Sequence, residues 1–477
     1  MNRNTIYLWG LGFFCLVSQS LATAALKDSS LPIAEMSDET RECVKCHEKY
    51  NPGIVQEWGK SKHYGANVGC YECHAAEQGD VDAYVHDDKK VKKLVSILVT
   101  PKDCGTCHEK AAYEMTNSRH AKAGHILDSL DNLLAEVVEG NRAMVTAGFP
   151  GGNSAAAVNG CWQCHGSKVK VLKNGELDPA TYPNTGIGRI NPDGSEGACS
   201  ACHSRHQFSA ALAREPDNCG KCHLGPDHPQ KEIYEESKHG IAYKAYKEEL
   251  NLDSSKWVVG VDYTAAPTCA TCHMGATKKQ PSSHNVGDRI SWTNRPPISV
   301  RPEVMDAKMG LASADLKWDT RRANMKDVCN ACHSEDHTEK FYIQYDALIE
   351  LYNEKFAKPG KALMETAKPL LKPTKFSNKV DWTWFELWHH EGRRARMAAS
   401  MQAPDYTHWH GTYDLAKHFY TKMVPELEEL VAKGMNSGDP EKVKAAEALQ
   451  AKLDEVLSSD NHKWYLGQRD KPAKAKK

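Results

Sequence analysis

The stretch Asn159–Lys168 reads NGCWQCHGSK and contains two cysteines separated by two residues, with a histidine directly after the second. The same CxxCH pattern occurs eight times in this chain of 477 residues and uses all but one of its 17 cysteines. The cysteines of the motifs are, in chain order, Cys43, Cys46, Cys70, Cys73, Cys104, Cys107, Cys161, Cys164, Cys199, Cys202, Cys219, Cys222, Cys269, Cys272, Cys329 and Cys332. The histidines that end the motifs are His47, His74, His108, His165, His203, His223, His273 and His333.

This pattern is typical of covalent haem attachment. Two thiols separated by two residues can add to the two vinyl groups of one porphyrin, and the adjacent histidine then ligates the iron from below. Disulfides and zinc are the rival interpretations of many cysteines. Neither requires a histidine directly after the second cysteine of every pair. The sequence therefore predicts eight covalently attached c-type haems, each with one proximal histidine.

The first 24 residues have the pattern of an export signal. Arg3 supplies a positive start, residues 6–17 form an apolar run, and Ala22 and Ala24 provide a small-residue cleavage site. We therefore expect a periplasmic or otherwise exported protein that is soluble after cleavage. The net charge of −1 gives no indication of nucleic-acid binding.

The remaining sequence predicts a mainly α fold with two regions. Residues 25–335 contain all eight motifs and read as short helices joined by haem-wrapping loops. Residues 336–477 read as a helical domain. Tyr342, Tyr345, Ile349, Tyr352 and Phe356 follow helical spacing. Near the end, Asp439 and Pro440 are typical of a helix start after the turn at 434–438, which predicts a helical hairpin.

The remaining histidines supply candidates for the second axial ligand of each haem, since an electron-transfer haem is usually closed by two protein ligands. The candidates in clear local contexts are His63, His86, His120, His206, His239, His284 and His390. The seventh position is also open to His125, His337, His389, His408 and His410.

Motif 4, Cys161–His165, differs from the others in its surroundings. The segments from His125 to His165 and from His165 to His203 contain no further histidine. Motif 4 is therefore the candidate for a haem whose second side is left open to a substrate. A separate clue is Asp227 followed by His228, which would suit proton exchange near a haem. The alternative is that His228 is another distal ligand and Asp227 a capping residue.

Several longer stretches resemble the octahaem hydroxylamine oxidoreductase family. They are the eight motifs in order, CHSRHQFSAA at 202–211, CHLGPDH at 222–228, SKHG at 237–240, APTCATCHM at 266–274 and the helical segment after motif 8. The resemblance implies that seven haems with two histidine ligands act as electron wires. It also implies that motif 4, with proximal His165, carries the catalytic haem, and that Asp227 and His228 form its distal proton-exchanging pair. The helical domain at 336–477 would then form a trimer and cap this haem.

The resemblance leaves the direction of the reaction open. In oxidative members a tyrosine from a neighbouring subunit is bonded to the catalytic haem and ties the protein into a homotrimer. Tyr406 falls where this tyrosine is expected, which favours oxidation of hydroxylamine or hydrazine and places Tyr406 among the catalytic residues. Reductive members lack the bond and convert nitrite or hydroxylamine to nitric oxide or ammonia. In either direction we expect a redox partner protein, such as another c-type cytochrome. A conduit without catalysis, with all eight haems closed by two histidines, is the alternative of a different class.

Overall fold

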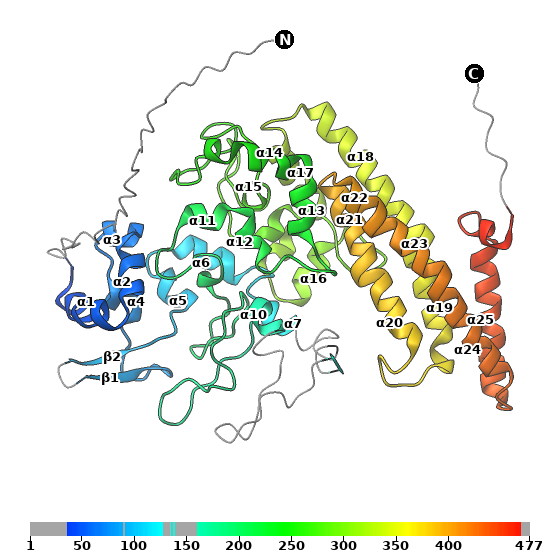
Figure 1. Cartoon of the computed structure of the whole chain (residues 1–477), viewed down its shortest axis with the longest axis horizontal. Helices are drawn as coiled ribbons and strands as arrows, with labels where there is room; N and C mark the ends of the chain where they lie inside the picture. The colour runs from blue at the N-terminus through cyan, green and yellow to red at the C-terminus, as the bar shows by residue number, and fades with distance from the viewer. Residues whose placement is uncertain (1–35, 89–90, 127–133, 135–136, 139–159, 469–477) are drawn as a thin grey trace, which may run out of the picture.

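The computed structural model describes residues 36–468, except 89–90, 127–133, 135–136 and 139–159. The predicted export signal lies outside the described residues. The fold is mainly α, as the sequence predicts (Figure 1). In the described part of the chain, the single sheet is the antiparallel pair of β1 (Tyr84–Asp88) and β2 (Val91–Val95). None of the described helices is both long and apolar enough to cross a membrane.

Short helices and loops make up the region of the motifs. Most of these helices are a few turns or less, because each motif supplies one helical turn and Pro- or Gly-containing loops follow. The helices up to motif 8 are α1 (Asp38–Tyr50), α2 (Pro52–Gly59), α3 (Lys62–Gly65), α4 (Cys70–His74), α5 (Pro101–Gly105), α6 (Glu109–Thr116), α7 (Ala123–Ile126), α10 (Cys161–His165), α11 (Ala210–Arg214), α12 (Pro216–Gly220), α13 (Gln230–Glu236), α14 (Lys238–Tyr246), α15 (Cys269–His273), α16 (Pro302–Lys308) and α17 (Trp318–Cys329).

Three long helical rods follow motif 8, drawn from yellow to red in Figure 1. Short π-helical segments interrupt each rod without ending it. The first rod joins α18 (Glu335–Tyr352), η6 (Asn353–Ala357) and α19 (Lys358–Ala367). The second joins α20 (Lys379–Phe385), η8 (Glu386–Glu391) and α21 (Gly392–Ser400). The third joins α22 (Pro404–Thr407), η9 (His408–Tyr413), α23 (Asp414–His418), η10 (Phe419–Met423) and α24 (Val424–Met435), and α25 (Pro440–Ser458) folds back on it.

The apolar core of the rods comes from residues at helical spacing. Ile349, Tyr352 and Phe356 are buried on the first rod, and Leu427 and Leu453 are buried on the hairpin. This confirms the periodicity read from the sequence. The hairpin also begins as predicted, because the Asp439 side chain accepts a hydrogen bond from the backbone N–H of Glu441 and Pro440 opens α25.

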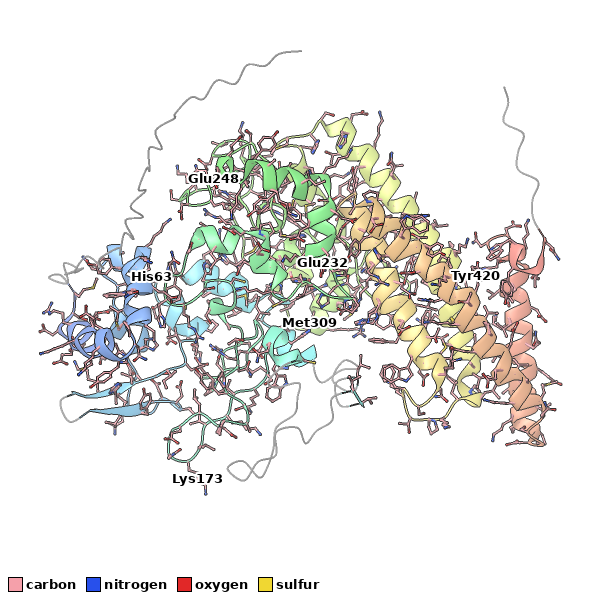
Figure 2. All side chains as sticks on the ribbon, viewed as in Figure 1. His63, Lys173, Glu232, Glu248, Met309 and Tyr420 are labelled. Atoms are coloured by element: carbon pink, nitrogen blue, oxygen red, sulfur yellow. The ribbon has the colours of Figure 1, made fainter. Side chains whose placement is uncertain are left out.

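The second rod connects the two regions. Its helix α21 packs against α13, which directly follows motif 6, and α22 packs against α21 (Figure 1). Ile233 of α13 is buried against Ala398 of α21 and Ala403. Figure 2 shows Glu232 of α13 at this junction. The junction brings side chains of the helical rods to the loop after motif 6.

Candidate active site

The eight motifs present their side chains as haem attachment requires. Several of them form a single helical turn, as in α4, α10 and α15, so that the two cysteines lie three residues apart on one face. None of the sixteen described cysteines is in a disulfide. The thiols therefore remain available for thioether bonds.

Six of the motif histidines face a second histidine across a gap of nearly constant width. The distances between ring centres are 6.1 Å for His47 and His86, 6.4 Å for His74 and His206, 6.0 Å for His63 and His108, 6.4 Å for His203 and His284, 6.1 Å for His120 and His223, and 6.1 Å for His239 and His333.

This width fits one iron atom between two imidazole rings. A ring nitrogen lies roughly 2 Å from a metal ion that it binds, so that two rings on opposite sides of one ion have centres about 6 Å apart. On the far side of the ring, Nδ1 of His74 lies 2.7 Å from the carbonyl oxygen of Ser96. Such a bond orients a ligating histidine and leaves Nε2 for the metal. The residues present thus fit haem.

Burial keeps several of these rings neutral. Removal from water lowers the pKa of His120, His203 and His273 to about 4, and the neighbouring histidines add to the effect. A neutral imidazole retains the lone pair that a metal ligand needs.

The structure thus brings six predicted distal histidines opposite a motif histidine, namely His63, His86, His120, His206, His239 and His284. Their ligation of iron stays a prediction. The seventh, His390, instead lies with its ring 5.5 Å from that of His389, near Asp227. Among the described residues, no imidazole faces His273 at the spacing of the six pairs.

The other candidates for the seventh position have different neighbours. His125 Nε2 lies 2.9 Å from a carboxylate oxygen of Glu196. The ring of His337 stacks on His333 at 4.7 Å, which is too close for an iron atom between them. His410 Nε2 lies 3.2 Å from Asp405, and the ring of His408 contacts Trp409.

Contacts between cysteines show which motifs are neighbours. The thiol of Cys164 in motif 4 is within hydrogen-bonding reach of Cys222 in motif 6. The same holds for Cys104 and Cys199, and for Cys219 and Cys269. Motif 4 therefore lies directly beside motif 6, and motif 6 lies beside motif 7, so that haems attached there would be adjacent.

The loop after motif 6 places Asp227 and His228 next to motif 4. The hydrogen bond with Cys222 lowers the pKa of the Cys164 thiol, and the nearby negative charge of Asp227 acts in the opposite direction. The backbone carbonyl oxygen of Lys221 lies 3.9 Å from the Cys164 sulfur. His228 Nε2 lies 3.3 Å from Asp227 Oδ2. The other ring nitrogen of His228, Nδ1, is buried and has no hydrogen-bond partner among the described residues. The ring of His228 also lies 5.8 Å from that of His223, the histidine of motif 6.

Two further groups reach Asp227 from the second helical rod. His389 Nδ1 in η8 and Arg393 Nη1 in α21 each lie 3.9 Å from Asp227 Oδ2. The ring of His389 stacks on Phe385 at 4.3 Å, and the Arg393 guanidinium lies over the ring of Trp388. No sequence pattern predicts that Arg393 and Trp388 lie at this site, although both are close in sequence to the candidate ligands His389 and His390.

Tyr406 lies on α22 and packs, partly buried, against the cluster of Ile233, Ala398 and Ala403 at the same junction. Its backbone N–H donates to a carboxylate oxygen of Glu236 in α13 at 3.1 Å, and its ring lies 4.9 Å from that of His410. Desolvation raises the pKa of its hydroxyl, and the nearby acids Glu232 and Glu236 act in the same direction. The described contacts of Tyr406 are with its own chain, and its predicted cross-link stays a prediction.

Two family models match parts of the chain. Residues 193–362 match a family described as "Seven times multi-haem cytochrome CxxCH", and residues 16–75 match "Cytochrome c554 and c-prime". A curated relative is the "Probable nitrite reductase-hydroxylamine oxidoreductase fusion protein" of Kuenenia stuttgartiensis, 29% identical over 331 residues. This match covers 61% of the present chain and 34% of the relative, so the chain spans about a third of that relative's length.

Solved structures share the fold. A "Hypothetical multiheme protein" superposes with a TM-score of 0.68 at 26% identity, over 83% of this chain and 96% of its own. A Kuenenia stuttgartiensis reducing HAO-like protein complex gives a TM-score of 0.53 at 19% identity, over 88% and 87%. The motifs and both family models agree that the chain is a multihaem c-type cytochrome with covalently bound haem c, and its curated relative is similar to it in a part that belongs to a hydroxylamine oxidoreductase fusion protein.

Proposed function

We propose that this chain is a periplasmic octahaem oxidoreductase that acts on a small nitrogen compound (hydroxylamine, hydrazine or nitrite) at motif 4 and exchanges electrons with a redox partner protein through the other seven motifs. The observation that carries the proposal is the pairing of His228 with Asp227 beside Cys164, with the buried Nδ1 of His228 left without a partner among the described residues. Proton-coupled chemistry at nitrogen requires a side chain that can exchange a proton with the substrate, and His228 could supply it.

The chemistry divides between the haem and the side chains. Haem held by Cys161, Cys164 and His165 would supply a coordination position for nitrogen and a path for electrons. Asp227 orients the ring of His228 through Nε2, and His228 exchanges a proton with the substrate at Nδ1. The desolvated surroundings of this nitrogen strengthen its interaction with a polar substrate.

Replacing His228 with alanine tests this role. We expect turnover of hydroxylamine or nitrite to fall by about 10²- to 10⁴-fold, the range for loss of a general acid or base. Haem content, measured by the spectrum of the pyridine haemochrome, should stay at the wild-type value. Equal losses of haem and activity would show instead that His228 holds the structure or a haem.

Separate features favour the oxidative and the reductive direction of the reaction. Oxidation of hydroxylamine or hydrazine is favoured by the position of Tyr406 in the sequence, where the cross-linking tyrosine of oxidative members is expected. The side chains of Trp409 and Tyr413, which follow it along the chain, are exposed and could meet a second subunit of a homotrimer. Reduction of nitrite or hydroxylamine is favoured by the cationic and imidazole groups that surround Asp227, since reduction of nitrogen oxides consumes protons.

Denaturing gel electrophoresis with haem staining separates these two candidates. A haem-stained band that persists at trimer mass would support the Tyr406 cross-link and the oxidative direction. A band at monomer mass, together with an ordinary c-type spectrum after reduction, would support the reductive direction.

A further inference from the structure

Two of the histidines that face a motif lie in loops rather than on a helix or strand. His63, His86 and His239 lie on α3, β1 and α14, where main-chain hydrogen bonds fix the course of the backbone. His206 and His284 have no such support from a regular element. A metal-binding side chain needs a fixed backbone, because a displacement of about 1 Å is enough to spoil a site. Another group must therefore hold these two loops.

A glutamate accepts a hydrogen bond from the main chain of each of these two histidines. The backbone N–H of His284 donates to Oε2 of Glu114 at 2.9 Å. The backbone N–H of His206 donates to Oε2 of Glu57 at 3.0 Å. Hydrogen bonds to a carboxylate are roughly twice as strong as those between neutral groups. The same arrangement thus occurs twice, in segments that are distant in sequence.

The two arrangements also have the same relation to the motifs. Glu114 lies on α6, which directly follows motif 3, while His284 faces motif 5. Glu57 lies on α2, which follows the helix of motif 1, while His206 faces motif 2. In both facing pairs the ring centres are 6.4 Å apart, and the ring planes are inclined by 37° and 38°. Each glutamate therefore joins the helix after one motif to the histidine that faces another motif.

Glu114 is the less exposed of the two glutamates. Its side chain is 18% exposed, whereas Glu57 is exposed. Glu114 Oε2 also lies 3.7 Å from Nδ1 of the His284 ring, and Lys110 Nζ lies 3.6 Å from the other carboxylate oxygen. The side chain of Lys110 is 63% exposed, so that water screens its charge more than the charge of Glu114. A negative charge therefore lies beside the imidazole of His284.

We propose that Glu114 is a positioning residue, which holds His284 opposite motif 5 through the main chain and lowers the reduction potential of the haem bound there through its charge. This rests on ligation of iron by His284, which belongs to the function proposed above. Oxidised haem iron carries one positive charge more than reduced iron, so that a nearby carboxylate stabilises the oxidised state.

Two substitutions of Glu114 separate the two effects. Glu114→Ala removes the acceptor and the charge. Cyanide should then displace His284 at a concentration about 10- to 100-fold lower than in the wild type, as expected for loss of a hydrogen bond to a charged group. Glu114→Gln keeps an acceptor oxygen and should restore this concentration to within about threefold of the wild type. Because glutamine is uncharged, the redox equilibrium of one haem should still shift about three- to tenfold towards the reduced state, where tenfold corresponds to about 59 mV for one electron.

Both quantities are measured on the fully haem-loaded protein by electron paramagnetic resonance, during a cyanide titration and a redox titration. Glu109→Ala is the control, because Glu109 is an exposed glutamate on the same helix α6. It should leave both quantities at their wild-type values. Glu57→Ala should act in the same direction on a different haem and by a smaller factor, because water screens an exposed carboxylate.

Wild-type values of both quantities in Glu114→Ala would overturn the proposal. An equal change in Glu109→Ala would also overturn it, because the effect would then be a general one on α6. If Glu114→Ala binds no haem, Glu114→Gln decides, since an unchanged potential in that variant contradicts the proposal. Failure of the predicted ligation is recognised separately, because His284→Ala would then produce no additional high-spin iron.

Discussion

At the scale of single residues, the proximal histidine of each haem site could be assigned to its motif from the sequence, whereas the facing histidines could be predicted only as a set. Each motif contains its own proximal histidine, because the histidine directly follows the second cysteine in the sequence. The facing histidine comes from elsewhere in the chain, as with His74 and His206, and its choice depends on how the loops fold. The sequence predicted six of the facing histidines as a set but could not assign them to motifs. The position of Arg393 beside Asp227 could not be predicted, because no sequence motif marks an arginine at such a site.

His206 gives a direct test of the facing pairs. Since its ring lies 6.4 Å from that of His74, we expect His206→Ala to leave one haem iron with a single histidine ligand. Electron paramagnetic resonance should then show about one additional high-spin iron per chain. His125→Ala is the control, because His125 is bound to Glu196 and faces no motif histidine in the described structure. A low-spin spectrum unchanged in His206→Ala would show that another side chain is the ligand.

At the scale of elements, helices could be predicted where apolar residues recur at helical spacing or where a capping residue marks the helix start. Tyr342 to Phe356 and the hairpin around Asp439 are examples. The π-helical segments were not, since η8 and η9 differ from an α-helix by a local insertion that no side-chain period reveals. One of them, η8, carries His389 and His390.

The contact between η9 and α21 depends on a glycine. A methyl group on Gly411 would lie 2.5 Å from Cα of Ala395 and 2.5 Å from the carbonyl oxygen of Tyr406. We expect Gly411→Ala to lower the free energy of unfolding by about 1–3 kcal/mol, as for other overpacked sites. The measurement is a urea titration followed by circular dichroism. Gly53→Ala, where nothing lies within 4 Å of the added methyl group, should change stability by less than about 1 kcal/mol. Equal effects at both sites would contradict the close packing.

The end of the chain contains a buried neutral histidine. His462 is 1% exposed, its Nδ1 lies 2.8 Å from the Tyr420 hydroxyl, and burial lowers its pKa to about 4. The unfolded chain binds a proton on this histidine below about pH 6.5 and the folded chain does not, so stability should fall as the pH drops from about 6.5 to 4, by at most about 3 kcal/mol. Hydrogen exchange of α25 at several pH values measures this, after correction for the intrinsic rates. In His462→Asn the dependence should be weaker, and an identical dependence would assign it to other groups.

At the scale of the whole molecule, the sequence predicted a motif-rich part and a helical part, but not their meeting point. The boundary at 336 stays a prediction, and Ile298, which precedes it, already packs into the core of the rods. The structure adds that the second rod places His389 and Arg393 close to Asp227. The loop after motif 6 in turn places Asp227 and His228 beside motif 4. No local pattern can predict such a meeting of three distant segments.

The central claim is that one haem of the eight reacts with small molecules and the others carry electrons. Cyanide titration of the oxidised protein, followed by electron paramagnetic resonance with quantified haem, tests it most directly. The account predicts that cyanide converts about one iron per chain and leaves the signals of the bis-histidine haems unchanged. A protein whose irons are all low-spin before cyanide and unchanged after it would be an electron conduit, and the assignment of motif 4 as a reaction site would be wrong.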